Sequence, residues 1–466
     1  MRQPADADPA GLELSLDSLP AGRASRCRTG RAGLRRLVLL TAGLCWALAR
    51  AAAPAEAAAV KAEMADKIVD LIGVNTHVGF RGTIYDTGYA TIIRPRLLEL
   101  GVRHIRDSPG PADDALVKGR YVDLARNGVR TLMINWPERG QGQDYVKELN
   151  ATAGFSVVEA VEPPNERDIT WQYYDFGPEW PARLQDYMRA MYPAYKSDPA
   201  TAGITVLGPS FANTRDSALQ LAGGFPDAAA YLDAGNLHDY SGLNPENPRA
   251  GGWGLALTAS LQRYRALAGT KPLWTTENGY KQSGSVVGHP AVTSRAAAKY
   301  LPRQFLMHFR YGVARFYIYE LINETWEDFG LLSNDGQPRQ QYWSVKRFIR
   351  IMKDAGRTFE TGSLDYELTG DLTSVYSSLF QKRDGRFYLA VWQGVESVRG
   401  TEDAAIANIE QPLRRLTLNL RSPVTQARIF RPLVSVQPRE SYSDEAGLAA
   451  ISLAVPDDVL IVELTP

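Results

Sequence analysis

After residue 60 the chain alternates short apolar runs with longer amphipathic stretches, and no other feature of the sequence constrains the fold as strongly. The runs are rich in the residues typical of β-strands, and they lie at 71–75, 102–106, 129–134, 157–161, 204–207, 234–237, 272–275 and 314–318. Helix-like segments lie between them, at 93–100, 180–195, 255–267 and 294–310. Strands that alternate with helices form parallel sheets. Eight such units over about 250 residues predict an α/β fold, a (β/α)8 TIM barrel.

An open, doubly wound sheet is the second candidate for this region. Such sheets usually carry a glycine-rich phosphate loop after the first strand, and residues 73–79, Gly-Val-Asn-Thr-His-Val-Gly, do not form one. Past about residue 355 the pattern changes to short β-type runs with turn residues between them, including the hairpin signal Asp384-Gly385. We therefore expect a barrel over residues 60–355 and a C-terminal antiparallel β-sandwich over 356–466.

Residues 1–59 form a third region, an N-terminal tail with a signal segment. Arg35-Arg36 precede an apolar run at 37–48, and small residues follow it. This pattern is typical of a secretory signal, and the run is short for a membrane span, which needs about 20 residues. We expect cleavage near residues 57–59 and export to the periplasm or the cell exterior. The long stretch before the run leaves two alternatives: translation starts later, or the segment remains as a membrane anchor.

The composition argues against several classes of partner. The formal net charge is zero, whereas a nucleic-acid-binding protein carries a basic excess. The five histidines include no His-x-x-x-His pair or similar cluster, so we expect no metal and no other cofactor. Membrane contact is expected only through an uncleaved N-terminal segment.

The residues directly after the predicted strands are unusually polar. In a barrel of this kind, functional groups project from the carboxyl ends of the strands. Glu166 follows the fourth run and Glu277 the seventh, so we expect them to face each other across the barrel mouth. Cleavage of a glycosidic bond needs two such carboxyl groups, one neutral and one charged. Burial and a nearby negative charge keep one of them neutral.

Four segments at strand ends carry a resemblance to a known group of enzymes. They are Ile105-Arg106-Asp107, Glu162-Pro-Pro-Asn165-Glu166, Asn236-Leu-His238-Asp-Tyr240 and Thr275-Thr-Glu277-Asn-Gly-Tyr280. In this order they resemble the strand-two Arg, the strand-four Glu-x-x-Asn-Glu, the strand-six His-x-Tyr and the strand-seven nucleophile segment of clan A glycoside hydrolases. Family 39, with its bacterial exopolysaccharide-degrading members, is the most similar family. The chain departs from the usual pattern at Pro164, where Trp is common, and at Arg167, where Pro is common.

The resemblance implies a retaining double displacement on a β-linked polysaccharide or oligosaccharide. Glu277 is then the nucleophile and Glu166 the acid/base. Glu162 is a rival acid/base, but the motif places it one level down the strand as a structural partner. Arg167 would lower the pKa of Glu166 if it pointed inward, and we expect it to point away. The other predicted site residues bind the substrate or orient the glutamates, and Arg106 among them keeps Glu277 ionised: Asn165, Arg106, His238, Tyr240, Asn75, His77, Trp136, Trp171, Tyr280 and Tyr319.

Two other functions remain open on the same barrel. One is a non-catalytic glycan-binding protein, and the other is a transglycosylase, which differs only in its acceptor. In all three cases the partner is a glycan.

Overall fold

The computed structural model describes residues 59–466, apart from 137–141, 170–175, 247–254, 285–288, 324–327 and 402–403. Residues 57–466 belong to one compact unit. The predicted signal segment lies outside the described residues. Among the helices that the structure describes, none has both the length and the apolar character needed to cross a membrane.

Eight parallel strands form the predicted barrel. Their order around the sheet is β7-β6-β5-β4-β3-β10-β9-β8, and a parallel bridge between Leu207 and Ala234 joins the two ends of this order. Each of the eight apolar runs overlaps one strand, so the predicted fold class is confirmed. The strands are β3 (Ile72–Asn75), β4 (His104–Asp107), β5 (Arg130–Ile134), β6 (Val158–Glu162), β7 (Thr205–Val206), β8 (Gly235–His238), β9 (Leu273–Asn278) and β10 (Val313–Ile318).

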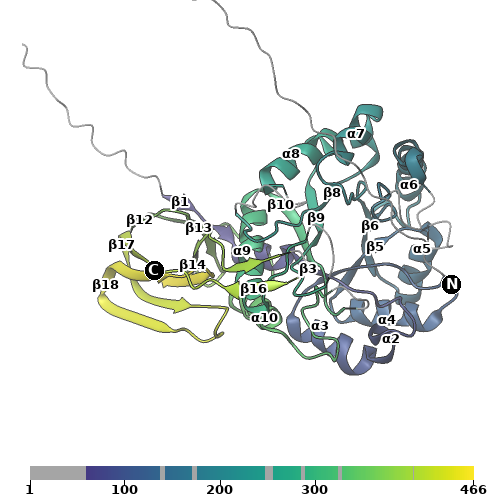
Figure 1. Cartoon of the computed structure of the whole chain (residues 1–466). Helices are drawn as coiled ribbons and strands as arrows, with labels where there is room; N and C mark the ends of the chain where they lie inside the picture. Colours follow the sequence, from purple (N-terminus) through teal and green to yellow (C-terminus); the bar gives the residue numbers. More distant parts are fainter. Residues whose placement is uncertain are drawn as a thin grey trace, which may run out of the picture. The chain divides into compact units, whose positions relative to one another are not determined.

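Helices follow the strands along the chain, and Figure 1 shows them around the outside of the barrel. Local signals mark several of their ends. The Asp114 side chain accepts hydrogen bonds from two backbone amides at the start of α4, and α3 ends at Gly101 in the left-handed conformation. The helices are α1 (Ala65–Leu71), α2 (Ile84–Thr87), α3 (Arg94–Leu100), α4 (Ala115–Arg126), α5 (Gln143–Ala153), α6 (Trp180–Ser197), α7 (Ser217–Gly224), α8 (Leu257–Ala268), α9 (Ser294–Arg310) and α10 (Gln340–Met352).

The barrel interior changes from apolar to polar toward the carboxyl ends of the strands. Trp274 and Tyr317 stack at 6.4 Å in a small buried cluster drawn from several strands. Gly73 leaves room for them, because a Cβ there would lie 2.5 Å from the Tyr317 ring. Side chains in a strand alternate between its two faces, so Asn75, two residues beyond Gly73, continues on the same face at the mouth.

A β-bulge in β9 sets the direction of Glu277. Leu237 of β8 pairs with Thr275, whereas the next residue, His238, pairs with Glu277. Thr276 is therefore the extra residue. A bulge re-aims the side chains that follow it, and here it directs the Glu277 carboxylate toward the centre of the mouth.

The C-terminal region forms antiparallel β-sheets, as predicted. β17 is a long strand and pairs with a second long strand, β18. Its pairing register with β18 shifts between Asn419 and Val424, and there β17 passes from β12 to β19. The strands are β11 (Ser363–Leu364), β12 (Tyr366–Gly370), β13 (Val375–Gln381), β14 (Phe387–Gln393), β15 (Val398–Gly400), β16 (Ala405–Asn408), β17 (Arg414–Phe430), β18 (Glu440–Val455) and β19 (Leu460–Thr465).

The beginning of the described chain also belongs to these sheets. β1 (Val60–Lys61) pairs with β11, and β2 (Glu63–Met64) pairs in parallel with β13. Both segments lie within the range expected for the barrel, residues 60–355. Strands of two residues are too short to carry a periodic pattern, so the sequence gives no sign of this pairing.

Helix α9 joins the barrel to the C-terminal sheets (Figure 1). Every residue from Ala296 to His308 is buried. Lys299 donates to both carboxylate oxygens of Asp457 at 2.7 and 3.0 Å. One hydrophobic core contains residues of the barrel, of α9 and of β14, so the two regions are packed as one unit.

Candidate active site

The carboxyl ends of the barrel strands carry a buried polar network centred on Arg106. This side chain, on β4, is 3% exposed. Its Nη1 donates to Oε1 of Glu277 at 2.6 Å and to Oδ1 of Asn75 at 3.0 Å. Its Nε donates to Oε1 of Glu162 at 2.7 Å, and its Nη2 to Oδ1 of Asn165 at 2.6 Å. One guanidinium therefore joins residues of β3, β6 and β9 and of the loop after β6.

Glu277 is held at both carboxylate oxygens. Oε1 accepts from Arg106, and Oε2 accepts from the Tyr240 hydroxyl at 2.9 Å. His238 Nδ1 lies 3.5 Å from the same Oε2. These contacts fix the orientation of the carboxylate and supply positive charge beside it.

Glu166 lies in the turn after β6 and reaches the same place. Its backbone is in the left-handed region, with φ at +46°. Its Oε1 is 2.6 Å from Nδ1 of His238. One carboxylate oxygen of Glu166, one of Glu277 and one ring nitrogen of His238 lie within 4.8 Å of one another. The fold thus brings together two glutamates that are far apart in the sequence.

The surroundings shift the pKa values of the two glutamates in opposite directions. Burial raises the pKa of Glu166, His238 lowers it, and the negative charge of Glu277 raises it. The net result is a raised pKa for Glu166. Burial also opposes ionisation of Glu277, but His238, Arg106 and the Tyr240 hydroxyl outweigh it and lower its pKa. Burial lowers the pKa of His238, and the two glutamates raise it above its ordinary value. The site therefore favours one protonated and one ionised glutamate.

Glu162 lies one level deeper in the barrel and is fully buried. Its Oε1 accepts from Arg106, and its Oε2 accepts from Nδ2 of Asn236 at 2.8 Å. Asn236 in turn accepts a hydrogen bond from the Thr276 hydroxyl. Both oxygens of Glu162 are thus occupied within the network.

His77 and Tyr319 lie on the wall of the mouth formed by the loops after β3 and β10. His77 Nε2 is 3.1 Å from Oε2 of Glu320. The His77 ring meets the Tyr319 ring edge-on, with centroids 6.3 Å apart. Tyr319 also contacts the Phe329 ring at 5.5 Å.

Arg167 contacts aromatic rings next to the acid. Its guanidinium lies over Trp136 at 4.6 Å and over Phe176 at 4.7 Å, an arrangement that stabilises a buried cation. Trp136 is itself buried. Trp171, the other tryptophan predicted for this part of the site, lies outside the described residues.

Tyr280 was expected to bind substrate, but the structure places it in the core. It is 4% exposed, and its hydroxyl accepts from Nε2 of Gln304 on α9 at 2.9 Å. Its ring packs on Tyr300 of α9 with centroids 5.2 Å apart. Tyr280 lies beyond the end of β9, where the chain has already turned toward α9, and substrate binding by this residue stays a prediction.

Two residues that the sequence does not mark as functional enclose the ring of Tyr240. His289 meets it edge-on with centroids 4.5 Å apart, and Phe329 does so at 5.9 Å. They come from the loops after β9 and β10, well past the strand ends. No motif or spacing marks either position, so only the folded chain identifies them.

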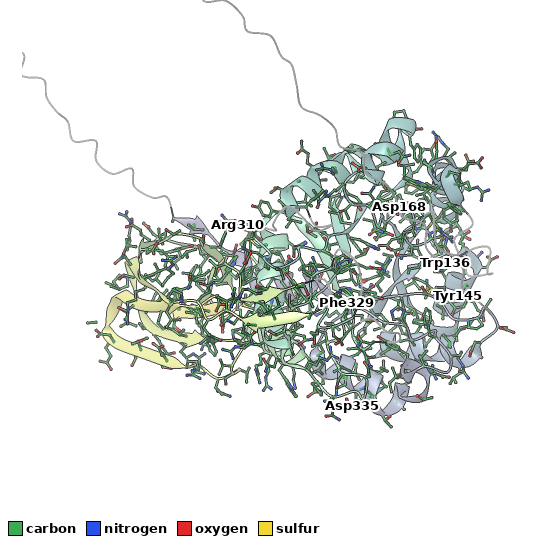
Figure 2. All side chains as sticks on the ribbon, viewed as in Figure 1. Trp136, Tyr145, Asp168, Arg310, Phe329 and Asp335 are labelled. Atoms are coloured by element: carbon green, nitrogen blue, oxygen red, sulfur yellow. The ribbon has the colours of Figure 1, made fainter. Side chains whose placement is uncertain are left out.

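Asp168 is a further missed residue, and it ties two loops of the mouth together. Its carboxylate accepts from the backbone amides of Ala212 and Asn213 at 3.0 and 2.8 Å, and from the Ser217 hydroxyl at 2.8 Å. It thereby fixes the loop carrying Glu166 to the loop after β7. Figure 2 labels Asp168, with Trp136 and Phe329.

Within the described residues, Glu166, His238 and Glu277 form the one group of three acidic or histidine side chains close enough to ligate a metal ion. His238 Nδ1 is already 2.6 Å from Glu166, and Glu277 accepts from Arg106. An arginine beside the donor set disfavours a cation.

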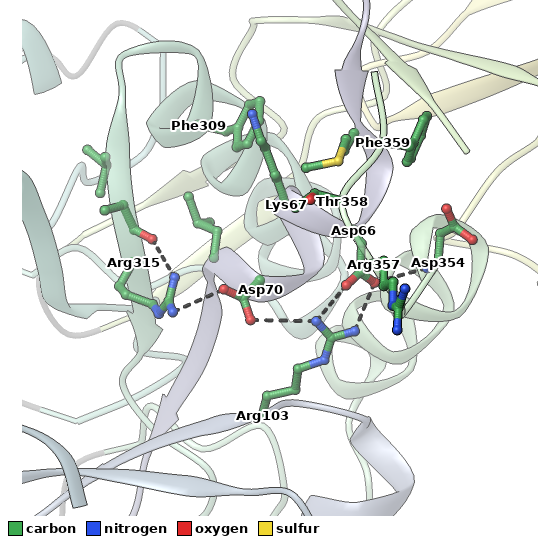
Figure 3. A pocket seen from close by; sticks show the side chains of 15 residues that line it. Asp66, Lys67, Asp70, Arg103, Phe309, Arg315, Asp354, Arg357, Thr358 and Phe359 are labelled. Carbon is green, nitrogen blue, oxygen red and sulfur yellow. Dashed lines mark hydrogen bonds and ion pairs between the residues drawn. The ribbon is translucent and has the colours of Figure 1, made fainter. Parts of the chain in front are cut away.

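A cavity of about 350 Å³ lies at the opposite, amino-terminal ends of β3, β4 and β10 (Figure 3). Four of its charges pair with one another: Arg103 donates to both oxygens of Asp66 at 2.7 and 2.8 Å, and Arg315 lies 3.0 Å from Asp70. In barrels of this type this end contributes to stability, whereas function resides at the carboxyl ends. The candidate site is therefore the Arg106 network and not this cavity.

Comparisons with known proteins place the fold. No protein-family model and no curated protein matches the chain. A family 39 glycoside hydrolase from Bacteroides cellulosilyticus WH2 is similar to it at 15% sequence identity and a TM-score of 0.57, over 86% of this chain and 82% of that chain. A GH30 endoxylanase from Clostridium papyrosolvens C71 is similar at 12% identity and a TM-score of 0.53, over 88% of this chain and 98% of that chain. A family 51 α-L-arabinofuranosidase from Bifidobacterium longum is similar at 13% identity and a TM-score of 0.52, over 88% of this chain and 98% of that chain. At these identities the likeness shows a shared fold.

Proposed function

We propose that this protein is a retaining glycoside hydrolase that cleaves a β-linked glycan. One observation carries the proposal: carboxylate oxygens of Glu166 and Glu277 approach within 4.8 Å, in surroundings that shift their pKa values apart. Retaining enzymes hold their carboxyl groups about 5–5.5 Å apart, whereas inverting enzymes leave about 6.5–9.5 Å for a water molecule. The fold neighbours, whose names describe glycoside hydrolases, support the same class.

In the first step, the ionised Glu277 attacks the anomeric carbon while Glu166 gives its proton to the glycosidic oxygen. The bond between these two atoms breaks, the aglycone leaves as an alcohol, and a glycosyl ester forms on Glu277. Arg106 and Tyr240 hold the attacking carboxylate in one orientation.

In the second step, Glu166 removes a proton from water, and the water attacks the same carbon and releases Glu277. Esterification removes the negative charge of Glu277, which is one of the causes that raise the pKa of Glu166. The pKa of Glu166 therefore falls in the intermediate, and the same group that acted as an acid becomes a base.

The product anomer tests the mechanism. Proton NMR of early product should show retained configuration, and an inverted first product would overturn the proposal. Glu277→Ala should be inactive, and azide should partly restore turnover by giving the glycosyl azide of opposite configuration. Glu360→Ala removes a carboxylate that is 99% exposed and should keep full activity.

We also propose that the protein acts outside the cytoplasm, because residues 35–59 have the pattern of a secretory signal. Mass spectrometry of the protein recovered from its native cells should find a new N-terminus near residues 57–59. An intact Met1 in a cytoplasmic fraction would contradict it.

A further inference from the structure

The loop after β9 is held by a hairpin of the C-terminal region, β15–β16. Ser283 forms an antiparallel bridge with Ala404. At the other end of the loop, the Ala291 amide donates to the Thr401 carbonyl at 2.7 Å. Gly400 approaches so closely that a Cβ there would lie 2.0 Å from the Ala291 carbonyl oxygen. The hairpin therefore bonds to the loop on both sides of His289.

His289 lies in this loop, between the two points that bond to the hairpin, and packs against Tyr240. Its ring meets the Tyr240 ring at 4.5 Å and an interplanar angle of 76°, and it meets Phe329 at 5.7 Å. Burial and the charge of Lys281 lower the pKa of His289 to about 4. At neutral pH it therefore acts as an uncharged aromatic wall behind Tyr240.

The loop after β8, which carries Tyr240, is anchored from the same region. Trp392 of β14 donates through Nε1 to Oε1 of Glu246 at 2.8 Å. Arg303 of α9 donates to the same oxygen at 2.9 Å and to the carbonyl oxygen of Asp457 at 2.9 Å. Both loops that meet at Tyr240 thus depend on contacts with the C-terminal sheets.

We propose that the C-terminal sheets are part of the active site, because the β15–β16 hairpin holds His289 against Tyr240 and so keeps the Tyr240 hydroxyl on Glu277. His289 is a positioning residue that acts through Tyr240. This inference rests on the proposed function, in which Glu277 is the nucleophile.

The inference predicts a specific change in the pH profile. The groups that face Glu277 are Arg106, His238, Tyr240, Glu166 and His289. If the Tyr240 hydroxyl moves away, one cause that lowers the pKa of Glu277 is lost, and its pKa rises. The acid limb of kcat/KM then moves to higher pH by about one unit, with a larger effect on kcat than on KM.

The experiment compares full-length variants. His289→Ala removes the ring, His289→Phe keeps an aromatic ring, and Gly400→Val pushes the hairpin from the loop. Gly119→Ala, a helix position with no atom within 4 Å of the added Cβ, is the control. Hydrogen–deuterium exchange of peptides covering 237–246 and 278–293 requires no substrate. Activity is measured on the 2,4-dinitrophenyl β-D-glycosides of glucose, galactose, mannose and xylose, and on a panel of bacterial exopolysaccharides and plant cell-wall glycans.

Gly400→Val should speed hydrogen–deuterium exchange in both loops at least severalfold. His289→Ala should move the acid limb of kcat/KM to higher pH, and His289→Phe should return it to the wild-type pH. The inference is overturned if exchange in Gly400→Val equals that of Gly119→Ala, or if the acid limb of His289→Ala stays at the wild-type pH. If Glu277→Ala is fully active, the proposed function fails, and the exchange result still decides whether the hairpin holds the loops.

Discussion

Replacing Arg106 with methionine would leave two buried carboxylates without their shared cation. In the folded protein the guanidinium lies 2.6 Å from Glu277 and 2.5 Å from Glu162, and its side chain is 3% exposed. Methionine has a similar length but carries no charge and donates no hydrogen bond. Breaking a buried ion pair from one side costs about 3–5 kcal/mol. The entropy of unfolding is roughly 2 cal/mol/K per residue, so for a unit of this size the lost stability lowers the melting temperature by about 4–6 °C.

The pH dependence of this loss follows from Glu277. Its pKa is lowered in the folded protein, so its ionised form adds stability above the pKa of the unfolded chain. That contribution is lost as the pH falls through the lower, folded-state pKa. Arg106→Met weakens the contribution. The difference in stability between variant and wild type is therefore largest near neutral pH and becomes smaller in acid. The pKa of Glu277 rises in the variant, so the acid limb of the pH–rate profile moves to higher pH by about 1–3 units.

Differential scanning calorimetry from pH 4 to 8 and pH–rate profiles measure both effects. Arg126→Met, an exposed arginine on α4, is the matched control and should melt like the wild type. Arg106→Lys keeps the charge but loses the fork of donors, and should fall between wild type and Arg106→Met. The reasoning is refuted if Arg106→Met melts within about 1 °C of wild type at pH 7, where about 4–6 °C is expected.

Three further substitutions test separate parts of the site. Glu166→Ala should remove the alkaline limb of kcat/KM, because the raised pKa of Glu166 governs the loss of activity as the pH increases. The variant should still cleave substrates with good leaving groups, and an unchanged alkaline limb would assign the acid to another residue. Tyr240→Phe removes one hydrogen bond to a charged group, worth about 1.5–3 kcal/mol, so kcat/KM should fall roughly 10- to 150-fold at pH 7, and a loss under about twofold would contradict the role. Gly279→Ala places a Cβ 1.9 Å from the Tyr319 carbonyl oxygen and should lower the melting temperature, whereas Gly203→Ala, with no atom within 4 Å of its Cβ, should not.

The barrel could be predicted from the sequence because short β-type runs alternate regularly with longer amphipathic stretches. The positions of Arg106, Glu166 and Glu277 could also be predicted, because residues at strand ends gather at one mouth. The aromatic residues could not be assigned in this way. Tyr280 follows a strand end but packs on α9, since the direction of the chain after the strand decides where the side chain points.

Contacts between distant segments account for the rest. His289 approaches Tyr240 only because a hairpin more than a hundred residues later holds its loop. β1 and β2 join the C-terminal sheets by pairing with partners some 300 residues away. Such contacts leave no periodicity in the sequence.

The left-handed backbone at Glu166 has a consequence for natural and designed variants. A residue other than glycine in this conformation costs about 1–3 kcal/mol, and only the carboxyl group gives a reason to keep glutamate there. Glu166→Gly would release that strain while destroying the acid, so the inactive protein should resist unfolding better than the working enzyme. A screen that selects for heat resistance alone would therefore favour loss of activity at this residue.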